Sequence, residues 1–191
     1  MNNIEFVHLH NHSEYSFLDG ACRIDDMINW ASETGAKAVA ITDHGSLFGV
    51  LDFYKAAKKK GVKPIFGCEV YFADNRYNRD AKSKREAADH LVLLAKDETG
   101  YKNLIKLVSF GYTEGFHYVP RIDKELLSEY HDGLIALTAC IKGRVPKLLL
   151  ENKYKEAKEH LYQLAEIVGK DNLYLELSLH RIDEEYAVMP R

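Results

Sequence analysis

The sequence predicts an α/β fold, because short apolar runs of strand length alternate with longer stretches of helical periodicity along its 191 residues. A hydrophobic fraction of 46%, with 11% aromatic residues, is enough to form a packed core and excludes a disordered chain. Two of the apolar runs, at 38–41 and 134–137, contain no polar residue, which is typical of parallel strands covered on both faces. We therefore expect a parallel sheet with helical crossovers.

Strands are predicted where apolar residues cluster over about five to eight positions. Six segments meet this condition: Glu5–Leu9, Ala38–Thr42, Pro64–Tyr71, Leu91–Ala95, Leu134–Thr138 and Leu173–Leu179. Six strands are fewer than the roughly eight of a closed βα barrel. The sequence also stops soon after a strand-like run, so the count predicts a piece of a longer chain.

Helices are predicted where apolar residues recur every three or four positions. Five segments show this spacing: Ile24–Glu33, Val50–Lys60, Thr99–Ser109, Lys124–Tyr130 and Lys153–Val168. The first should bury Ile24, Met27, Ile28 and Ala31 on one face.

The second predicted helix, 50–60, should pack Leu51, Tyr54 and Ala57 inward. Three lysines before Gly61 suit its C-terminus, where cations interact favourably with the helix dipole. The segment 73–88 differs from its surroundings, because it is rich in Arg and Lys and poor in apolar residues. We interpret 73–88 as an exposed excursion and its basic run at 76–85 as a solvated loop, with contact to phosphate as the alternative.

Charge and cysteine content exclude several classes of protein. The chain has 26 basic and 29 acidic residues, and a net charge of −3 gives it no basic field to hold nucleic acid alone. Its three cysteines are widely spaced without a CxxC pair, so no disulfide framework is expected. Neither a signal peptide nor an apolar run of about 20 residues occurs, which predicts a cytoplasmic protein away from membranes.

The densest chemical motif is the run of three histidines in five residues at 8–12. Alternate residues of an extended chain point to the same side, so His8, His10 and His12 can converge, and Asp19 follows shortly after. Imidazoles with a nearby carboxylate form the ligand sets of zinc, manganese and iron sites. A metal site is favoured over the alternative, a polar strand end with solvated histidines.

Four further strand ends carry residues that can bind metals, namely Asp43-His44, Glu69, His90 and Cys140. Each has an ordinary alternative. Asp43 can cap a helix, Glu69 can form a salt bridge, His90 can be structural and Cys140 can be a small buried apolar residue. Together they favour a site at one edge of the sheet, where parallel α/β folds build active sites.

The remaining histidines are weaker candidates. His180 follows the last predicted strand and could line the same opening. His160 should be exposed on the helix 153–168, whereas His117 and His131 should pack in a loop and at a helix C-terminus.

With these motifs, the chain resembles the polymerase-and-histidinol-phosphatase (PHP) family. The segments that carry the resemblance are HLHNHSEYSFLDG (8–20), ITDHGSLFGVLDFYKAAKKKGVKPIFGCEVY (41–71), LLAKDETGYKNLIKL (93–107), EGFHYVPRID (114–123) and GLIALTAC (133–140). The middle block and Pro-Arg-Ile-Asp are similar to the PHP domains of bacterial DNA polymerase III alpha subunits. Residues 1–191 are then expected to be one PHP domain, the N-terminal part of a longer subunit.

The resemblance implies a distorted, seven-stranded, TIM-like βα barrel with up to three divalent metal ions, zinc or manganese, at its mouth. Matched motif to motif, the implied metal ligands are His10, His12, Asp19, His44, Glu69, His90 and Cys140. Catalytic roles fall to Glu69, which would bridge two ions, and to His44 with Asp43 orienting it. His8 and His180 remain weaker candidates. The family's final Asp-x-His motif does not occur, which implies a missing last strand with two ligands.

In function, the resemblance implies part of a DNA-directed DNA polymerase (a nucleotidyltransferase) of DNA replication, with a metal-dependent phosphoesterase site acting as a 3′–5′ proofreading exonuclease. Its expected partners are DNA, reached through the full-length polymerase, and other subunits of the polymerase III holoenzyme, including an exonuclease subunit. Two alternatives stay open. The domain could be a metal-braced scaffold for the polymerase, or a stand-alone phosphatase of a small phosphate monoester such as histidinol phosphate.

Overall fold

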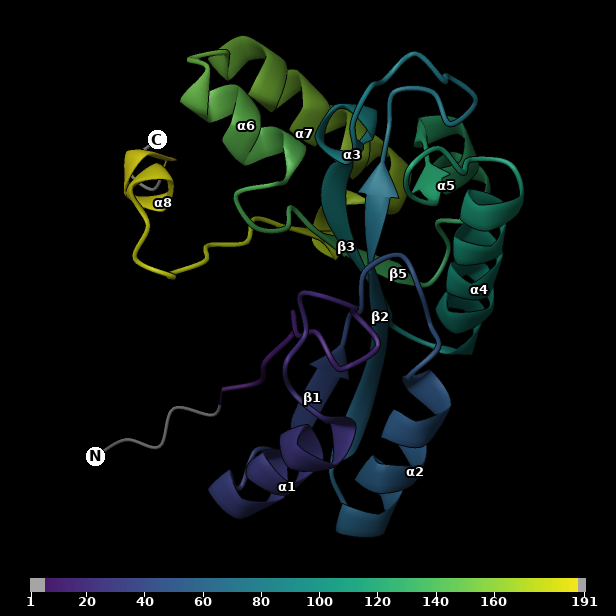
Figure 1. Cartoon of the computed structure of the whole chain (residues 1–191), viewed down its shortest axis with the longest axis vertical. Coiled ribbons are helices and arrows are strands. Elements are labelled where there is room, and N and C mark those ends of the chain that lie inside the picture. Colours follow the sequence, from purple (N-terminus) through teal and green to yellow (C-terminus); the bar gives the residue numbers. More distant parts are fainter. Residues whose placement is uncertain (1–5, 189–191) are drawn as a thin grey trace.

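The computed structural model describes residues 6–188, and these form one mixed α/β unit (Figure 1). The strands are β1 (Ala38–Ile41), β2 (Lys63–Phe72), β3 (Asp89–Ala95), β4 (Arg121–Ile122), β5 (Leu134–Leu137) and β6 (Leu173–Tyr174). They belong to one sheet in the order β1-β2-β3-β5-β6, with β4 paired to β2. The predicted α/β class is confirmed.

Strand β3 runs against its neighbours. The pairs β1–β2, β2–β4 and β5–β6 are parallel, whereas β3 is antiparallel to both β2 and β5. The expectation of a uniformly parallel sheet is therefore wrong at β3. A parallel pair needs a crossover that returns the chain to the starting edge, and segment 73–88 instead joins β2 to β3 as the connection of a long hairpin. As a result, β3 begins at the edge of the sheet where β1, β2 and β5 end.

Between residues 6 and 188, eight α-helices surround the sheet: α1 (Ile24–Thr34), α2 (Val50–Lys60), α3 (Lys84–Ala87), α4 (Glu98–Thr113), α5 (Lys124–Glu129), α6 (Arg144–Leu150), α7 (Tyr154–Val168) and α8 (Asp183–Val188), with a 3-10 turn at Lys170–Asn172. The five predicted helices are confirmed with small shifts at their ends. The short α3, α6 and α8 were not predicted. Within the described residues, no helix has the length and apolarity to cross a bilayer.

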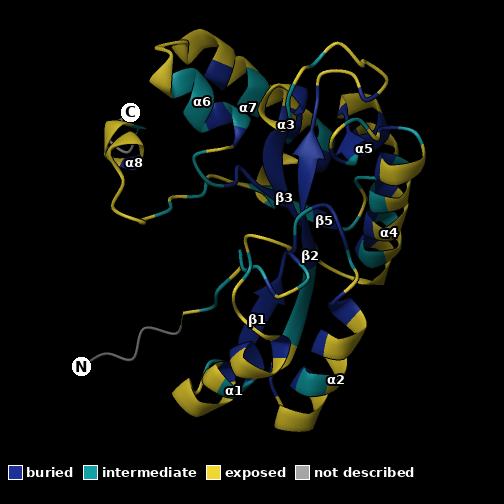
Figure 2. Cartoon of the chain, in the orientation of Figure 1, coloured by how far each residue is buried: buried dark blue, intermediate teal, exposed yellow. Residues whose placement is uncertain are grey.

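Apart from β6 and the first residues of β2, the strands are buried in the middle of the molecule, with helices on their flanks (Figure 2). One face of the sheet packs on α4, α5 and α7 through residues such as Leu104, Leu127 and Leu164, all nearly inaccessible to solvent. The helices α1 and α2 cover β1 in a second cluster. Burial of Ile24, Met27, Ile28 and Ala31 confirms the predicted face of α1.

Helix α2 buries a face that shares only Ala57 with the predicted one. Leu51 and Tyr54 are 61% and 42% exposed, whereas Val50, Phe53 and Ala57 are buried. Both stripes have helical spacing. Phe53, whose ring is fully buried against α1 and β1, removes more apolar surface from water than Leu51 does and decides the orientation.

The connection 73–88 is less solvated than predicted. Arg76 is only 7% exposed and forms ion pairs with Asp123 at 2.8 Å and Glu114 at 3.1 Å. The guanidinium of Arg121, 2% exposed, donates to the carbonyl oxygens of Gly115, Arg76 and Asn78. Two buried arginines therefore hold the base of this segment, which corrects the interpretation of 76–85 as a purely solvated loop.

His160 is also more buried than expected. It packs edge-on against Phe72, with ring centroids 6.0 Å apart, and burial lowers its pKa to about 4. The prediction of an exposed His160 is wrong, because α7 turns this residue toward the sheet.

The two outermost predicted strands are shorter than expected. Glu5 lies outside the described residues, and residues 6–9 are not a strand, although the His8 carbonyl accepts a hydrogen bond from the Ala40 amide at 2.9 Å. The segment 173–179 pairs only at β6, and Leu175 and Leu177 beyond it are 64% and 71% exposed. An apolar cavity of about 1020 Å³ lies between these two edges of the sheet.

Candidate metal centre

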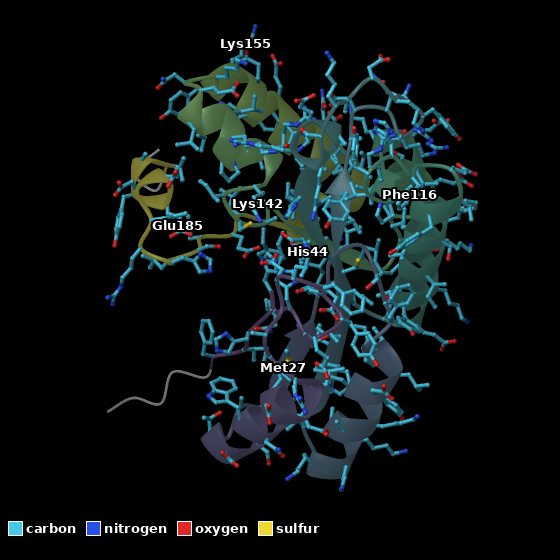
Figure 3. The ribbon with its side chains drawn as sticks, viewed as in Figure 1. Met27, His44, Phe116, Lys142, Lys155 and Glu185 are labelled. Carbon is cyan, nitrogen blue, oxygen red and sulfur yellow. The ribbon has the colours of Figure 1, made fainter. Side chains whose placement is uncertain are left out.

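The strand ends meet in a pocket of about 290 Å³, on the side of the molecule where β1, β2 and β5 end and β3 begins. Its lining comprises His10, His12, Asp19, His44, Glu69, His90, Cys140, Lys142, Glu176, Ser178 and His180. Figure 3 labels His44 and Lys142, which lie near the middle of the molecule. All seven predicted metal ligands therefore line one pocket, together with the weaker candidate His180.

The histidine pair His10 and His12 is positioned by the residue between them. The Asn11 side chain donates to the carbonyl oxygens of His8 and Ala40, and the Asn11 amide donates to Thr42 Oγ1 at 2.8 Å. These bonds fasten the 8–12 segment along β1. Because alternate residues of an extended chain point the same way, His10 and His12 both face the pocket.

Asp43 holds the loop that carries Asp19. It is 1% exposed and accepts hydrogen bonds from Ser13 N at 2.6 Å, Ser13 Oγ at 2.7 Å and Ser16 Oγ at 2.7 Å. Gly20 closes the same loop, since a Cβ there would lie 1.9 Å from the Ser13 carbonyl oxygen. Asp43 is thus turned away from the pocket and bonded to the loop.

Glu69 is the centre of the pocket, 1% exposed and three residues before the end of β2. Its Oε1 lies 3.4 Å from His10 Nε2 and 2.7 Å from His90 Nδ1. Its Oε2 lies 3.2 Å from His12 Nε2 and 2.8 Å from His44 Nδ1. We call these five residues the Glu69 cluster. It places four imidazoles around one buried carboxylate.

The charges of the cluster are coupled. Burial alone would raise the pKa of Glu69, but the surrounding imidazoles hold it well below its usual range. Burial likewise opposes protonation of His10, but the carboxylates of Glu176 and Glu69 raise its pKa to about 9. The pKa of His44 is raised by Glu69 and Asp19 against the effect of burial, whereas burial lowers that of His90. Glu69 is therefore ionised, and positive charge beside it is favoured.

The donor atoms of the cluster fit divalent cations. Among the described residues, His10 Nε2, His44 Nδ1 and Glu69 Oε2 are buried without a hydrogen-bond partner, even though His44 Nδ1 and Glu69 Oε2 are close. Leaving such atoms unpaired costs about 1–3 kcal/mol each. Ligand atoms gather in two groups, His10–His12–Glu69 and His44–Glu69–His90, each within 4.8 Å. Imidazole nitrogens with a shared carboxylate suit zinc or manganese, and Glu69 belongs to both groups.

Asp19 and Cys140 lie at the edge of the cluster. Asp19 Oδ2 is 2.5 Å from His44 Nε2, and this contact lowers the pKa of Asp19. Cys140 Sγ is 3.9 Å from Glu69 Oε1, and burial raises the pKa of its thiol. Both residues line the pocket but belong to neither compact ligand group.

The two weaker candidates, His180 and His8, lie in different parts of the molecule. His180 lines the pocket, and its Nδ1 lies 2.6 Å from Glu185 Oε1. His8 packs against Trp30, with ring centroids 5.0 Å apart, and lines the apolar cavity instead.

Three residues of the pocket were missed from the sequence: Lys142, Glu176 and Ser178. Glu176 Oε1 lies 2.7 Å from His10 Nδ1. The Lys142 carbonyl accepts a hydrogen bond from the His90 amide at 3.1 Å. A charged residue in a short apolar run and a lysine after a strand are too common for their positions alone to have indicated a site.

Sequence comparisons agree with these motifs. A family model described as "PHP domain" matches residues 8–180. The chain is similar to DNA polymerase III subunit alpha from Borreliella burgdorferi, with 47% identity over 97% of this chain, and from Aquifex aeolicus, with 48% identity over 95%. In both cases the match covers 16% of the relative, so the chain spans about one sixth of the length of these proteins.

One solved structure with a similar fold is an amidohydrolase from Chromobacterium violaceum with bound sulfate and no metal. The two share 16% identity and a TM-score of 0.47, over 88% of this chain and 84% of the other. At this TM-score the likeness adds nothing to the sequence matches.

Proposed function

This chain belongs to the PHP-domain family, and we propose that it is the metal-dependent phosphoesterase domain of a DNA polymerase III alpha subunit. Its substrate would be a DNA strand, trimmed from the 3′ end as in proofreading. The proposal includes a cytoplasmic location and a place within the polymerase holoenzyme, where the rest of the subunit would supply the grip on DNA that a net charge of −3 does not.

One observation carries the proposal: a buried, ionised carboxylate meets four imidazoles whose inward atoms are partly unpaired. The two ligand groups that share Glu69 would hold two divalent ions. Asp19, Cys140 and His180 line the same pocket. When bound, such ions lower the pKa of a water and stabilise charge on a phosphate.

Residues of the chain would hold the ions, position the surrounding loop and bind the phosphate. Glu69 and His44 hold the centre together, and Asp43 positions the 13–19 loop so that Asp19 reaches His44. Lys142 also lines the pocket and is exposed at its rim. Its positive charge favours the deprotonated forms of Asp19, His90 and Cys140. In this proposal Lys142 would bind a non-bridging oxygen of an incoming phosphodiester.

A second candidate function is structural. The 8–12 segment, the loop after β1, β2 and β3 all contribute to the Glu69 cluster, so bound cations would cross-link these parts of the fold. The domain would then brace the polymerase and dock partners, including a separate exonuclease subunit. A stand-alone phosphatase of a small monoester is the third reading, and the similarity to polymerase subunits over most of this chain disfavours it.

The test compares the chain with His44→Ala and with His131→Ala, a control at a histidine remote from the pocket. Each protein is stripped with a chelator and reloaded with zinc or manganese. Each is then given 5′-labelled single-stranded DNA and p-nitrophenyl phosphate. We expect metal-dependent shortening of DNA from its 3′ end in the parent and control, and none in His44→Ala. Metal binding and thermal stabilisation without hydrolysis would favour the scaffold, and turnover of the monoester alone would refute both.

A further inference from the structure

The sequence motifs leave Glu176 without a role, yet its carboxylate lies against the first histidine of the cluster. We propose that Glu176 is a positioning residue, which keeps the ring proton of His10 on Nδ1 and thereby directs the lone pair of Nε2 toward the cation held with Glu69. This inference rests on the proposed metal centre but not on any hydrolytic activity.

The geometry of His10 carries the first step. Its Nδ1 lies 2.7 Å from Glu176 Oε1, and its Nε2 lies 3.4 Å from Glu69 Oε1. An ionised carboxylate only accepts hydrogen bonds, so Nδ1 must carry the proton and donate the hydrogen bond to Glu176. In the neutral ring, Nε2 is then an acceptor that faces another acceptor, an arrangement that a cation between them would stabilise.

His10 differs from His12 and His44 in this respect. The second ring nitrogen of His12 faces the hydroxyl of Ser16 at 3.3 Å, and that of His44 faces Asp19, which is half-exposed. His10 instead has a carboxylate of low exposure at each nitrogen, 1% for Glu69 and 17% for Glu176. A carboxylate behind a ligating imidazole fixes its tautomer and raises its basicity.

The backbone around Glu176 holds the carboxylate in place. The Thr138 amide donates to the Tyr174 carbonyl oxygen at 3.2 Å, and the Glu176 amide donates to Thr138 Oγ1 at 2.9 Å. These two bonds extend β6 for one step past its last paired residue. They bring Glu176 to the pocket from the far edge of the sheet, so His10 and Glu176 also tie the two outer edges together.

The experiment measures zinc binding and the ring nitrogens of His10, neither of which requires catalysis. The whole chain and its Glu176→Ala, Glu176→Gln and Glu166→Ala variants are titrated with zinc by calorimetry. Glu166 is exposed on α7 and serves as the control. Long-range ¹H–¹⁵N spectra of the zinc-loaded proteins then report which nitrogen of His10 is protonated.

We expect Glu176→Ala to weaken zinc binding about 10- to 100-fold and to lose the pure Nδ1–H signature of His10. Glu176→Gln, whose amide oxygen still accepts a hydrogen bond, should keep that signature with a smaller loss of affinity, and Glu166→Ala should match the parent. Zinc affinity within twofold of the parent in Glu176→Ala, or an unchanged His10 signature, would overturn the proposal. If Glu176→Ala does not fold, the Glu176→Gln variant becomes the test. A proton on Nε2 of His10 in that variant would contradict the proposal. A parent that binds zinc but cleaves nothing would refute the proposed hydrolysis alone.

Discussion

Two clusters of buried charge lie at and just beyond strand β2, and in each the buried charge is compensated by a different kind of partner. The Glu69 cluster surrounds one carboxylate with four imidazoles. The second, which we call the Arg76 cluster, surrounds one guanidinium with acceptors: Asp123 at 2.8 Å, Glu114 at 3.1 Å, Glu125 at 3.2 Å and the Tyr77 hydroxyl at 2.7 Å.

The difference lies in whether the basic side chains of each cluster can lose their protons. Arginine stays protonated in proteins, so the ion pairs of Arg76 are permanent. Asp123 also accepts from the Arg76 and Leu126 amides, and no side-chain atom of the Arg76 cluster is buried without a partner. Imidazoles can give up their protons, and three atoms of the Glu69 cluster are unpaired. The ion pairs of buried carboxylates with arginine therefore stabilise this fold. The contacts of a buried carboxylate with histidines instead leave donor atoms that can bind a ligand.

The largest effect should come from Glu69→Ala. Because Glu69 belongs to both ligand groups, its removal should abolish binding at both, well beyond the roughly 10- to 100-fold loss typical of residues that only support ligands. Zinc content after dialysis measures this. If Glu69→Ala retained zinc at the parent stoichiometry, the assignment of cation binding to the Glu69 cluster would be wrong.

Asp123→Ala should produce the opposite pattern. It leaves the buried guanidinium of Arg76 with weaker partners and removes the side-chain cap of α5, so we expect a loss of roughly 3 kcal/mol in the free energy of unfolding. Zinc affinity should stay at the parent value. Urea denaturation and calorimetry on the same samples check both, and a joint loss would mean that the clusters are not independent.

The pH dependence of stability should separate the clusters further. In the metal-free chain, the carboxylates of Glu176 and Glu69 raise the pKa of His10 to about 9 against the effect of its burial, so protonation stabilises the folded state fully below about pH 6.5. That contribution, about 3 kcal/mol for a rise from 6.5 to about 9, is lost as pH rises through 9. The Arg76 cluster contributes nothing over this range. Unfolding between pH 6.5 and 9, with and without zinc, tests this, and a metal-free stability that is flat or rising would contradict it.

The smallest effect is expected at the rim. Lys142→Ala should leave zinc binding unchanged and weaken binding of inorganic phosphate to the zinc-loaded chain about fivefold, the scale of an exposed ion pair. Lys142→Arg should restore most of the affinity. Equal phosphate binding by all three proteins would remove Lys142 from the proposed substrate site.

The sequence could predict the candidate ligands because each is a chemically distinctive residue beside an apolar run or, for Glu69, within one. His10, His12, His44, Glu69 and His90 needed only local spacing and the resemblance to be identified, and the structure brings them within reach of one another. The order of strand and helix was predictable for the same reason, since periodicity is a local property.

What could not be predicted depends on tertiary partners. Periodicity permits two faces for α2, and only the buried site that receives Phe53 selects one. The reversed direction of β3 depends on the path of the 73–88 connection, and the burial of Arg76 depends on Asp123, 47 residues away. Glu176 belongs to the site only because Thr138 holds its backbone there.

The reversed β3 also determines which sequence changes the centre can survive. Glu69 and His90 stand on one face of a hairpin in which Tyr71 pairs with His90 and Glu69 with Val92. A residue inserted or deleted in the exposed part of the connection, near 79–82, leaves that register intact. The same single-residue change inside β3 would shift the pairing by one position and turn His90 to the opposite face of the sheet. Natural variation in length should therefore be tolerated beside the centre and excluded from the strand that borders it.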